Sequence, residues 1–281
     1  MLFLLFLFLS PITSFNNSSE LILNEPKLPV VLMHGILSNK EKMNELKSYL
    51  EINFDLNVVV PEIGNGSPNS LNLPLSDQGE ILCFELNNNT MLERGFNFIG
   101  ISQGGILARY YIEVCGNYRV NNFITLVSPH GGVYNNAGLI IDMYGKFAQE
   151  HYSFSSYWRD PYDYMRYTEV ALLAKLNNEV ETECSSMYKE RFTNLSNFVM
   201  VYSTEDEILK PAESGKFSTY SIDSLDVVSV EYTSTYNNLG LNEMADRNQL
   251  HVYETNCIHS EHIEYNCIKQ LHDMFKEFCL M

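Results

Sequence analysis

Basic residues are scarce in this chain of 281 residues, in which 18 Lys and Arg face 35 Asp and Glu for a formal net charge of −17. The balance argues against nucleic-acid binding, because proteins grip phosphates through Lys and Arg. The six cysteines include no C-x-x-C pair of the kind that binds zinc, and they are too few for a small disulfide scaffold. We expect one or more disulfides, no metal, no cofactor and no nucleic-acid partner.

Long hydrophobic runs are missing too. The first nine residues, MLFLLFLFL, are apolar, whereas a membrane-spanning helix needs about 20 such residues. We interpret residues 1–14 as a secretory signal peptide, with an uncleaved N-terminal anchor as the alternative. Sequons for glycosylation fit the same pathway, and the candidates are Asn65, Asn88 and Asn194. We therefore expect a secreted or lysosomal protein with no transmembrane anchor.

The remaining residues, 15–281, predict a single α/β domain. Strand-like apolar runs alternate with amphipathic segments, beginning with a strand at Pro29–Met33 and a helix at Lys40–Glu51. Such alternation predicts a mostly parallel central sheet with helices on both faces. Repeats and low-complexity linkers are absent from the sequence, and the polar stretch Gly64–Ser76 is interpreted as a loop.

An insertion is predicted at about residues 131–192, between the apolar strands Phe123–Ser128 and Phe198–Ser203. The segment is crowded with aromatic residues, among them Tyr134, Tyr144, Phe147, Tyr152, Phe154, Tyr157, Trp158, Tyr162, Tyr164 and Tyr167. A helical insertion at this point would form a lid over the carboxyl edge of the sheet, where ligands of such folds bind. We expect most of these rings to pack the lid onto the domain and a subset to line a groove for a hydrocarbon tail.

The stretch FNFIGISQGG, residues 96–105, is the most informative of the chain. Its apolar half predicts a buried strand, the residues from Gly104 onward predict a helix, and Gly100 and Gly104 leave room for a sharp turn. Ser102 would stand at the tip of that turn with a helix N-terminus behind it, which favours attack on an acyl carbon. The sequence therefore predicts a hydrolase with Ser102 as its nucleophile.

A nucleophilic serine at such a turn needs an acid and a base, which follow it along the chain in that order. For the acid we choose Asp206, and we interpret its neighbours Glu205 and Glu207 as solvated loop charges. Asp206 would orient the imidazole of the base without taking its proton. For the base we choose His259, in a loop-like stretch before the predicted last helix, and His262 is its rival.

Two main-chain N–H groups would stabilise the oxyanion that forms during acyl transfer. One is expected from Gln103, directly after the nucleophile, and the other from Ile36, in the turn of VVLMHGILSN after the first strand.

With these parts in place, the chain resembles the palmitoyl-protein thioesterases, lysosomal α/β-hydrolases that remove long-chain acyl groups from cysteine. The resemblance covers most of the chain after the signal peptide. The stretches that carry it are VVLMHGILSN, GISQGGILARYY, YWRDP at Tyr157–Pro161, NFVMV at Asn197–Val201 and LGLNEM…NQL at Leu239–Leu250. YWRDP and LGLNEM are more telling than the turn at Ser102, because these two stretches are not generic to hydrolases. The resemblance implies an α/β-hydrolase fold with a helical lid.

The resemblance also implies roles for single residues. By resemblance, Ser102 is the nucleophile, Asp206 the acid and His259 the base. The resemblance likewise makes Ile36 and Gln103 the oxyanion donors and joins Cys83 and Cys115 in a disulfide. It supplies no partners for Cys184, Cys257, Cys267 and Cys279, of which we pair Cys257 with Cys267. The family carries an acidic residue before the histidine, where this chain has Ile258.

The activity that the resemblance implies is hydrolysis of long-chain acyl thioesters on S-acylated proteins or peptides, through an acyl-enzyme and with a fatty acid as product. Two alternatives stay open. A lipase or carboxylesterase would use the same residues on oxygen esters, and a lipid carrier would keep the turn at Ser102 without its chemistry.

Overall fold

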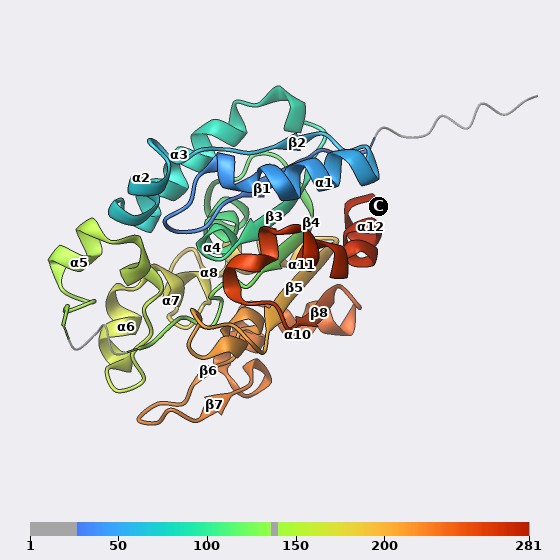
Figure 1. Cartoon of the computed structure of the whole chain (residues 1–281). Helices are drawn as coiled ribbons and strands as arrows, with labels where there is room; N and C mark the ends of the chain where they lie inside the picture. The colour runs from blue at the N-terminus through green and yellow to red at the C-terminus, as the bar shows by residue number, and fades with distance from the viewer. Residues whose placement is uncertain (1–26, 136–139, 281) are drawn as a thin grey trace, which may run out of the picture.

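A parallel six-stranded sheet forms the centre of the protein, with the strand order β2-β1-β3-β4-β5-β8 (Figure 1). The computed structural model describes residues 27–135 and 140–280, so the expected signal peptide, 1–14, lies outside the described residues. The strands of the sheet are β1 (Val30–Met33), β2 (Val58–Val59), β3 (Phe96–Ile101), β4 (Val120–Leu126), β5 (Asn197–Ser203) and β8 (Leu250–Thr255). Beside the sheet, β6 (Thr219–Tyr220) and β7 (Val227–Val228) pair antiparallel.

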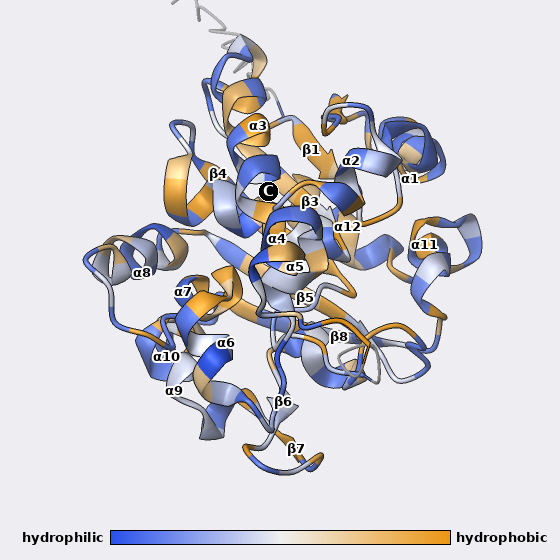
Figure 2. Cartoon of the chain, turned by 90° about the vertical axis from the view of Figure 1, so that its left-hand side faces the viewer, coloured by the Kyte–Doolittle hydropathy of each residue, from blue (hydrophilic) through white to orange (hydrophobic). Residues whose placement is uncertain are grey.

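Helices cover both faces of the sheet, and the alternation of apolar residues along each strand sets the two layers. Val30 and Leu32 of β1 pack against α1 (Asn44–Phe54), α11 (Tyr265–Gln270) and α12 (His272–Leu280). Val31 and Met33 belong to the opposite layer, with α3 (Leu75–Asn87), α4 (Gln103–Tyr110) and α8 (Ser185–Thr193). Figure 2 shows the hydrophobic colour of β1 between these layers. Strands that are apolar on both faces need this double cover, and the predicted α/β class is confirmed.

Short helices complete the described chain, namely α2 (Ser67–Asn72), α5 (Lys146–His151), α6 (Tyr164–Val170), α7 (Leu172–Leu176), α9 (Ser234–Asn238) and α10 (Leu241–Asp246). The interpretation of Gly64–Ser76 as a loop is wrong for Ser67–Asn72, which form α2, and for Leu75 and Ser76, which begin α3. Pro68 lies in the first turn of α2, where its fixed φ suits a helix and its missing N–H is not needed.

The chain between β4 and β5 folds as a helical segment at one side of the molecule (Figure 1). Within its described residues it contains α5, a 3-10 helix at Ser153–Tyr157, α6, α7 and α8. Its rings do not all behave alike. Tyr157, Trp158 and Tyr167 are buried, whereas Phe147 and Tyr162 are exposed.

Two disulfides form in the described chain. Cys83 of α3 is joined to Cys115, at the end of the helical segment that continues α4, and Cys257 is joined to Cys267 of α11. The thiols of Cys184 and Cys279 are free, the first exposed and the second buried.

Candidate active site

The turn from β3 into α4 holds Ser102 in a backbone conformation that residues other than glycine rarely adopt, with φ 52° and ψ −127°. Such a turn requires glycine nearby, because a Cβ on Gly100 would lie 2.5 Å from Cα of Gly105. A Cβ on Gly104 would lie 2.3 Å from the carbonyl oxygen of Met33. The local sequence thus lets strand, turn and helix pack tightly and leaves Ser102 at the carboxyl end of β3.

The loops after β5 and β8 bring Asp206 and His259 to Ser102. Asp206 is buried, and its Oδ1 accepts the N–H groups of Ile208 at 2.9 Å and Leu209 at 2.8 Å. Its Oδ2 lies 2.7 Å from Nδ1 of His259. Nε2 of the same imidazole lies 2.9 Å from Oγ of Ser102. Three residues that are far apart in the sequence therefore form one hydrogen-bonded chain.

The charge of Asp206 determines where the proton of His259 lies. Burial alone raises the pKa of Asp206, but the hydrogen bond and charge of His259 and the N–H groups of Leu209 and Ile208 outweigh it, so the pKa is lowered. The carboxylate is then an acceptor only, and Nδ1 of His259 donates to it. Nε2 is left with a lone pair that accepts the hydroxyl of Ser102, which is the arrangement a general base needs.

The two glutamates beside Asp206 and the rival histidine, His262, lie differently. Glu207 is exposed, as expected of a loop charge, yet its Oε2 also accepts the N–H of His259 at 2.9 Å. Glu205 is exposed. His262 is fully buried, and its ring contacts Thr255 and the backbone of the turn that carries His259. The structure therefore brings His259, and not His262, to the serine.

The two expected oxyanion donors belong to two turns that come close together at Ser102. Gln103 is the first residue of α4, where a backbone N–H has no partner within the helix. Ile36 follows Gly35 in the turn after β1, and a Cβ on Gly35 would lie 3.0 Å from Cβ of Ser102. The close approach brings this turn against Ser102, where its N–H groups could donate to an anion formed at that residue.

The side chain of Gln103 is part of a buried network that sequence reasoning missed. Its Nε2 donates to the carbonyl of Ser70 at 2.8 Å and to Oε1 of Gln78 at 3.1 Å, and its Oε1 accepts the hydroxyl of Tyr157 at 3.0 Å. The hydroxyl of Ser153 donates to the same carbonyl of Ser70 at 2.9 Å. The residue after the nucleophile is thereby tied to α2, α3 and the segment between β4 and β5.

A second missed contact supports the turn after β1. The buried ring of His34 lies with Nε2 2.9 Å from Oε1 of Glu62, whose Oε2 accepts the backbone N–H of Lys40 at 3.0 Å. A His-Gly pair at a strand end signals such a turn, but no pattern in the sequence points to Glu62.

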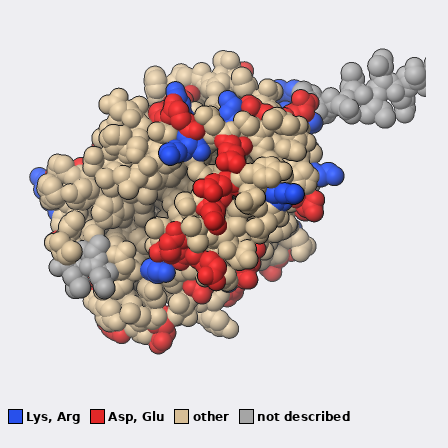
Figure 3. All heavy atoms as spheres, in the orientation of Figure 1, with Lys and Arg blue, Asp and Glu red and all other residues tan. Residues whose placement is uncertain are grey.

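Figure 3 shows Asp and Glu side chains gathered through the middle of the face that is seen in Figure 1. Within residues 27–135 and 140–280, no group of three or more His, Cys, Asp or Glu side chains is arranged to hold a metal ion. A helix long and apolar enough to cross a membrane is not found in the same residues. The sequons at Asn65, Asn88 and Asn194 are exposed.

Comparison with known proteins gives consistent results. Residues 29–259 match the family described as Palmitoyl protein thioesterase. Palmitoyl-protein thioesterase 3 of Dictyostelium discoideum is 36% identical over 254 residues, 85% of this chain and 88% of that protein. Lysosomal thioesterase PPT2-B of Xenopus laevis is 30% identical over 243 residues, which cover 80% and 83% of the two chains.

Among solved structures, the mature lipase BlEst2 of Bacillus licheniformis superimposes with a TM-score of 0.52 at 13% identity, covering 92% of this chain and 97% of that one. A bromoperoxidase of Bacillus anthracis gives a TM-score of 0.51 at 12% identity, covering 90% and 93%. At these identities the likeness concerns the fold alone.

Proposed function

The chain belongs to the palmitoyl protein thioesterase family, and from its site we propose that it hydrolyses long-chain fatty acyl thioesters on S-acylated proteins or peptides. The observation that carries the proposal is the hydrogen-bonded chain from Ser102 through His259 to Asp206. Membership of the family supports a thioester as the bond that is cleaved. We assign the nucleophile to Ser102, the base to His259 and the supporting acid to Asp206.

The reaction begins when Oγ of Ser102 attacks the acyl carbon and Nε2 of His259 takes its proton. The electron pair of the carbonyl moves onto oxygen, and the N–H groups of Ile36 and Gln103 donate to that anion. Asp206 stays ionised and stabilises the imidazolium, because its pKa is held low.

Collapse of this intermediate breaks the carbon–sulfur bond, and the sulfur leaves with the electron pair and the proton held by His259. A thiol is a good leaving group that needs little help from an acid. Water then gives a proton to Nε2 and attacks the acyl-enzyme, and the second collapse returns the proton to Oγ of Ser102. The products are a fatty acid and a free thiol on the protein or peptide.

We propose that the segment at about 131–192 acts as the lid of this site. The contact of Tyr157 with Gln103 supports this role, because it joins the segment to the residue that follows the nucleophile. We place the protein in the secretory pathway, either in lysosomes or secreted. The exposed sequons and the similarity to a lysosomal thioesterase support that location.

The decisive experiment compares purified wild-type protein with Ser102→Ala on a palmitoyl thioester of a short peptide. We expect kcat to fall about 10⁶-fold, to background. Ser128→Ala is the matched control, because Ser128 is also a buried serine, at the end of the neighbouring strand β4, and its hydroxyl bonds only to main-chain carbonyls.

Equal rates for Ser102→Ala and the wild type would exclude the assigned nucleophile. The matched oxygen ester of the same peptide separates the related activities, since faster cleavage of the ester would identify a lipase or carboxylesterase. Failure of Ser102 to react with a fluorophosphonate would identify a lipid carrier.

A further inference from the structure

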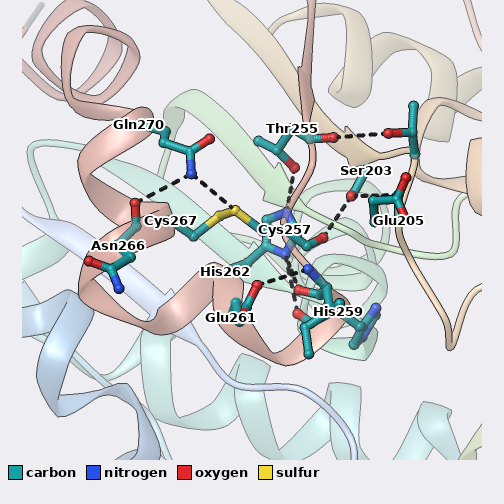
Figure 4. The surroundings of a disulfide bond; sticks show 12 residues. Ser203, Glu205, Thr255, Cys257, His259, Glu261, His262, Asn266, Cys267 and Gln270 are labelled. Carbon is teal, nitrogen blue, oxygen red and sulfur yellow. Dashed lines mark hydrogen bonds between the residues drawn. A yellow bond between two sulfur atoms is a disulfide. The ribbon is translucent and has the colours of Figure 1, made fainter.

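His262 has no exposed surface, and both nitrogens of its ring are engaged. Nδ1 lies 3.1 Å from the carbonyl oxygen of Ile258 and 3.2 Å from that of His259. Nε2 lies 2.8 Å from Oγ1 of Thr255. Figure 4 shows the ring between Thr255 and the backbone beside His259.

These partners determine the protonation of the ring. Carbonyl oxygens only accept, so Nδ1 of His262 carries the proton and donates to the two carbonyls. Nε2 then accepts the hydroxyl of Thr255. Burial lowers the pKa of His262, although hydrogen bonds to His259 and Ile258 and the charge of Asp206 oppose it, so the neutral form is favoured.

Thr255 gives the ring a rigid support. It is the last residue of β8, paired in register with Ser203 of β5, and its carbonyl accepts the N–H of Thr204 at 3.3 Å. The contact from Thr255 to His262 therefore links the sheet to the backbone around the base.

Three further backbone groups of residues 257–261, here called the base turn, make hydrogen bonds with side chains. The carbonyl of Cys257 accepts the hydroxyl of Ser203 at 2.7 Å, and Cys257 is bonded to Cys267 (Figure 4). The N–H of Ile258 donates to Glu261 at 3.0 Å, and the N–H of His259 donates to Glu207 at 2.9 Å. His262 supplies the side-chain contact on the carbonyl side of residues 258 and 259.

We propose that His262 is a positioning residue for His259: through Nδ1 it fixes the backbone of the base turn, and through Nε2 it anchors that turn to Thr255 of the central sheet. The inference rests on the proposed function of Ser102, His259 and Asp206. Its physical basis is that a base must lie within hydrogen-bond reach of both its partners, and a displacement of about 1 Å can cost about 100-fold in rate.

The test separates the two ring contacts by substitution. In His262→Asn the amide nitrogen reaches the position of Nδ1, so the contact with the two carbonyls is kept and that with Thr255 is lost. In His262→Gln the amide oxygen reaches the position of Nε2, so the contact with Thr255 is kept and that with the carbonyls is lost. His262→Leu loses both contacts.

We expect His262→Leu and His262→Gln to lower kcat on a palmitoyl thioester by about 10- to 100-fold with KM unchanged, and His262→Asn to lower it by less than about 5-fold. Thr255→Val should give a loss as small as that of His262→Asn, because both variants lose only the contact between Thr255 and residue 262. Adding Thr255→Val to His262→Leu should cause no further loss, because His262→Leu has already lost that contact. Equal kcat for the Asn and Gln variants, or full kcat for His262→Leu, would overturn the proposal.

His272→Leu is the control, because His272 also uses its ring in a hydrogen bond, Nδ1 lying 2.8 Å from the hydroxyl of Tyr49, but belongs to α12 and not to the base turn. We expect it to lower Tm and leave kcat unchanged. A loss of kcat in this control equal to that in His262→Leu would overturn the proposal, because it would show that the loss comes from general destabilisation and not from misplacement of His259. Where His262→Leu fails to fold, the Asn and Gln pair and Thr255→Val decide the matter.

The rate at which a fluorophosphonate labels Ser102 keeps this test apart from that of the proposed function. Labelling requires the aligned base and no thioester. Labelled wild-type protein that cleaves no thioester would refute the proposed function alone, and a slower labelling rate in His262→Leu would still support the positioning role. An unchanged rate in that variant would refute the positioning role alone.

Discussion

The hydroxyl of Tyr157 donates to the side-chain carbonyl of Gln103 at 3.0 Å, and both residues are buried. One of them lies in the segment between β4 and β5, and the other directly follows the nucleophile. The nucleophile turn and this segment are therefore parts of one packed unit.

The contact leads to a prediction on stability. Tyr157→Phe should lower the free energy of unfolding by about 1 to 3 kcal/mol, because it leaves the buried Oε1 of Gln103 without a donor. The two bonds from Nε2 of Gln103 remain, so kcat should fall by less than about 10-fold. Urea denaturation measures the first quantity. Tyr162→Phe is the control, because this side chain is 55% exposed, and it should change neither the free energy of unfolding nor kcat. An equal loss of stability in Tyr162→Phe would show that the effect of Tyr157→Phe does not come from the bond to Gln103.

Asp206→Asn should lower kcat by about 10⁴-fold with little change in fold, because a neutral amide allows the wrong tautomer of His259. Glu205→Gln is its control. Glu205 is exposed, and we expect the full rate there. Steady-state kinetics on the palmitoyl thioester decide the point, and activity retained in Asp206→Asn would assign the acid elsewhere.

Glu113 predicts a pH dependence of stability. It is fully buried next to Arg109, one of its carboxylate oxygens has no partner, and burial outweighs Arg109 and raises its pKa from 4.5 to about 7. An acid with a raised pKa folds best when protonated. Its contribution is present below the unfolded pKa of 4.5 and is lost as the pH rises toward the folded value of about 7.

Glu113 should therefore favour folding less at about pH 8 than at about pH 5, so over that rise in pH the free energy of unfolding should change less favourably in the wild type than in Glu113→Gln. Urea denaturation of both proteins at the two pH values measures the difference. Glu93→Gln, at an exposed position, should leave it unchanged. The same pH difference in Glu113→Gln and the wild type would show that Glu113 stays ionised.

Gly35→Ala should lower kcat by about 10- to 100-fold, because the new Cβ would lie 3.0 Å from Cβ of Ser102 and 3.1 Å from the carbonyl oxygen of Ile101. Gly145→Ala is the control, since the nearest atom there, 2.9 Å away, is at the end of the Asp142 side chain. Thioesterase kinetics and Tm are measured for both variants. Full activity in Gly35→Ala would show that the turn after β1 can move without loss.

The architecture and the local motifs were predictable from the sequence, since they depend on neighbours along the chain. Strand, turn and helix at 96–105 lie within ten residues, and the alternation of apolar runs specifies the parallel sheet that is confirmed. The helix α2 escaped prediction, because its six residues carry no apolar period and only Pro68 signals a start.

The contacts that organise the site could not be predicted in the same way. Gln103 and Tyr157 are 54 positions apart, and His34 and Glu62 are 28 apart, so no periodic pattern links them. His262 is a rival candidate base to His259 in the sequence alone, because a histidine near the end of the chain looks the same in sequence whether it faces the serine or the sheet. Only the packing of β5 against β8 distinguishes the two.

Gln103 also sets a condition on chimeras between related enzymes. A helical segment grafted between β4 and β5 from another member must bring a donor to the carboxamide of Gln103, as Tyr157 does. Exchanging the helices of this segment without that hydroxyl would leave the buried Oε1 of Gln103 without a donor. A chimera of this kind should therefore keep the 3-10 helix Ser153–Tyr157 of this chain, because that helix carries the hydroxyl that bonds to Gln103.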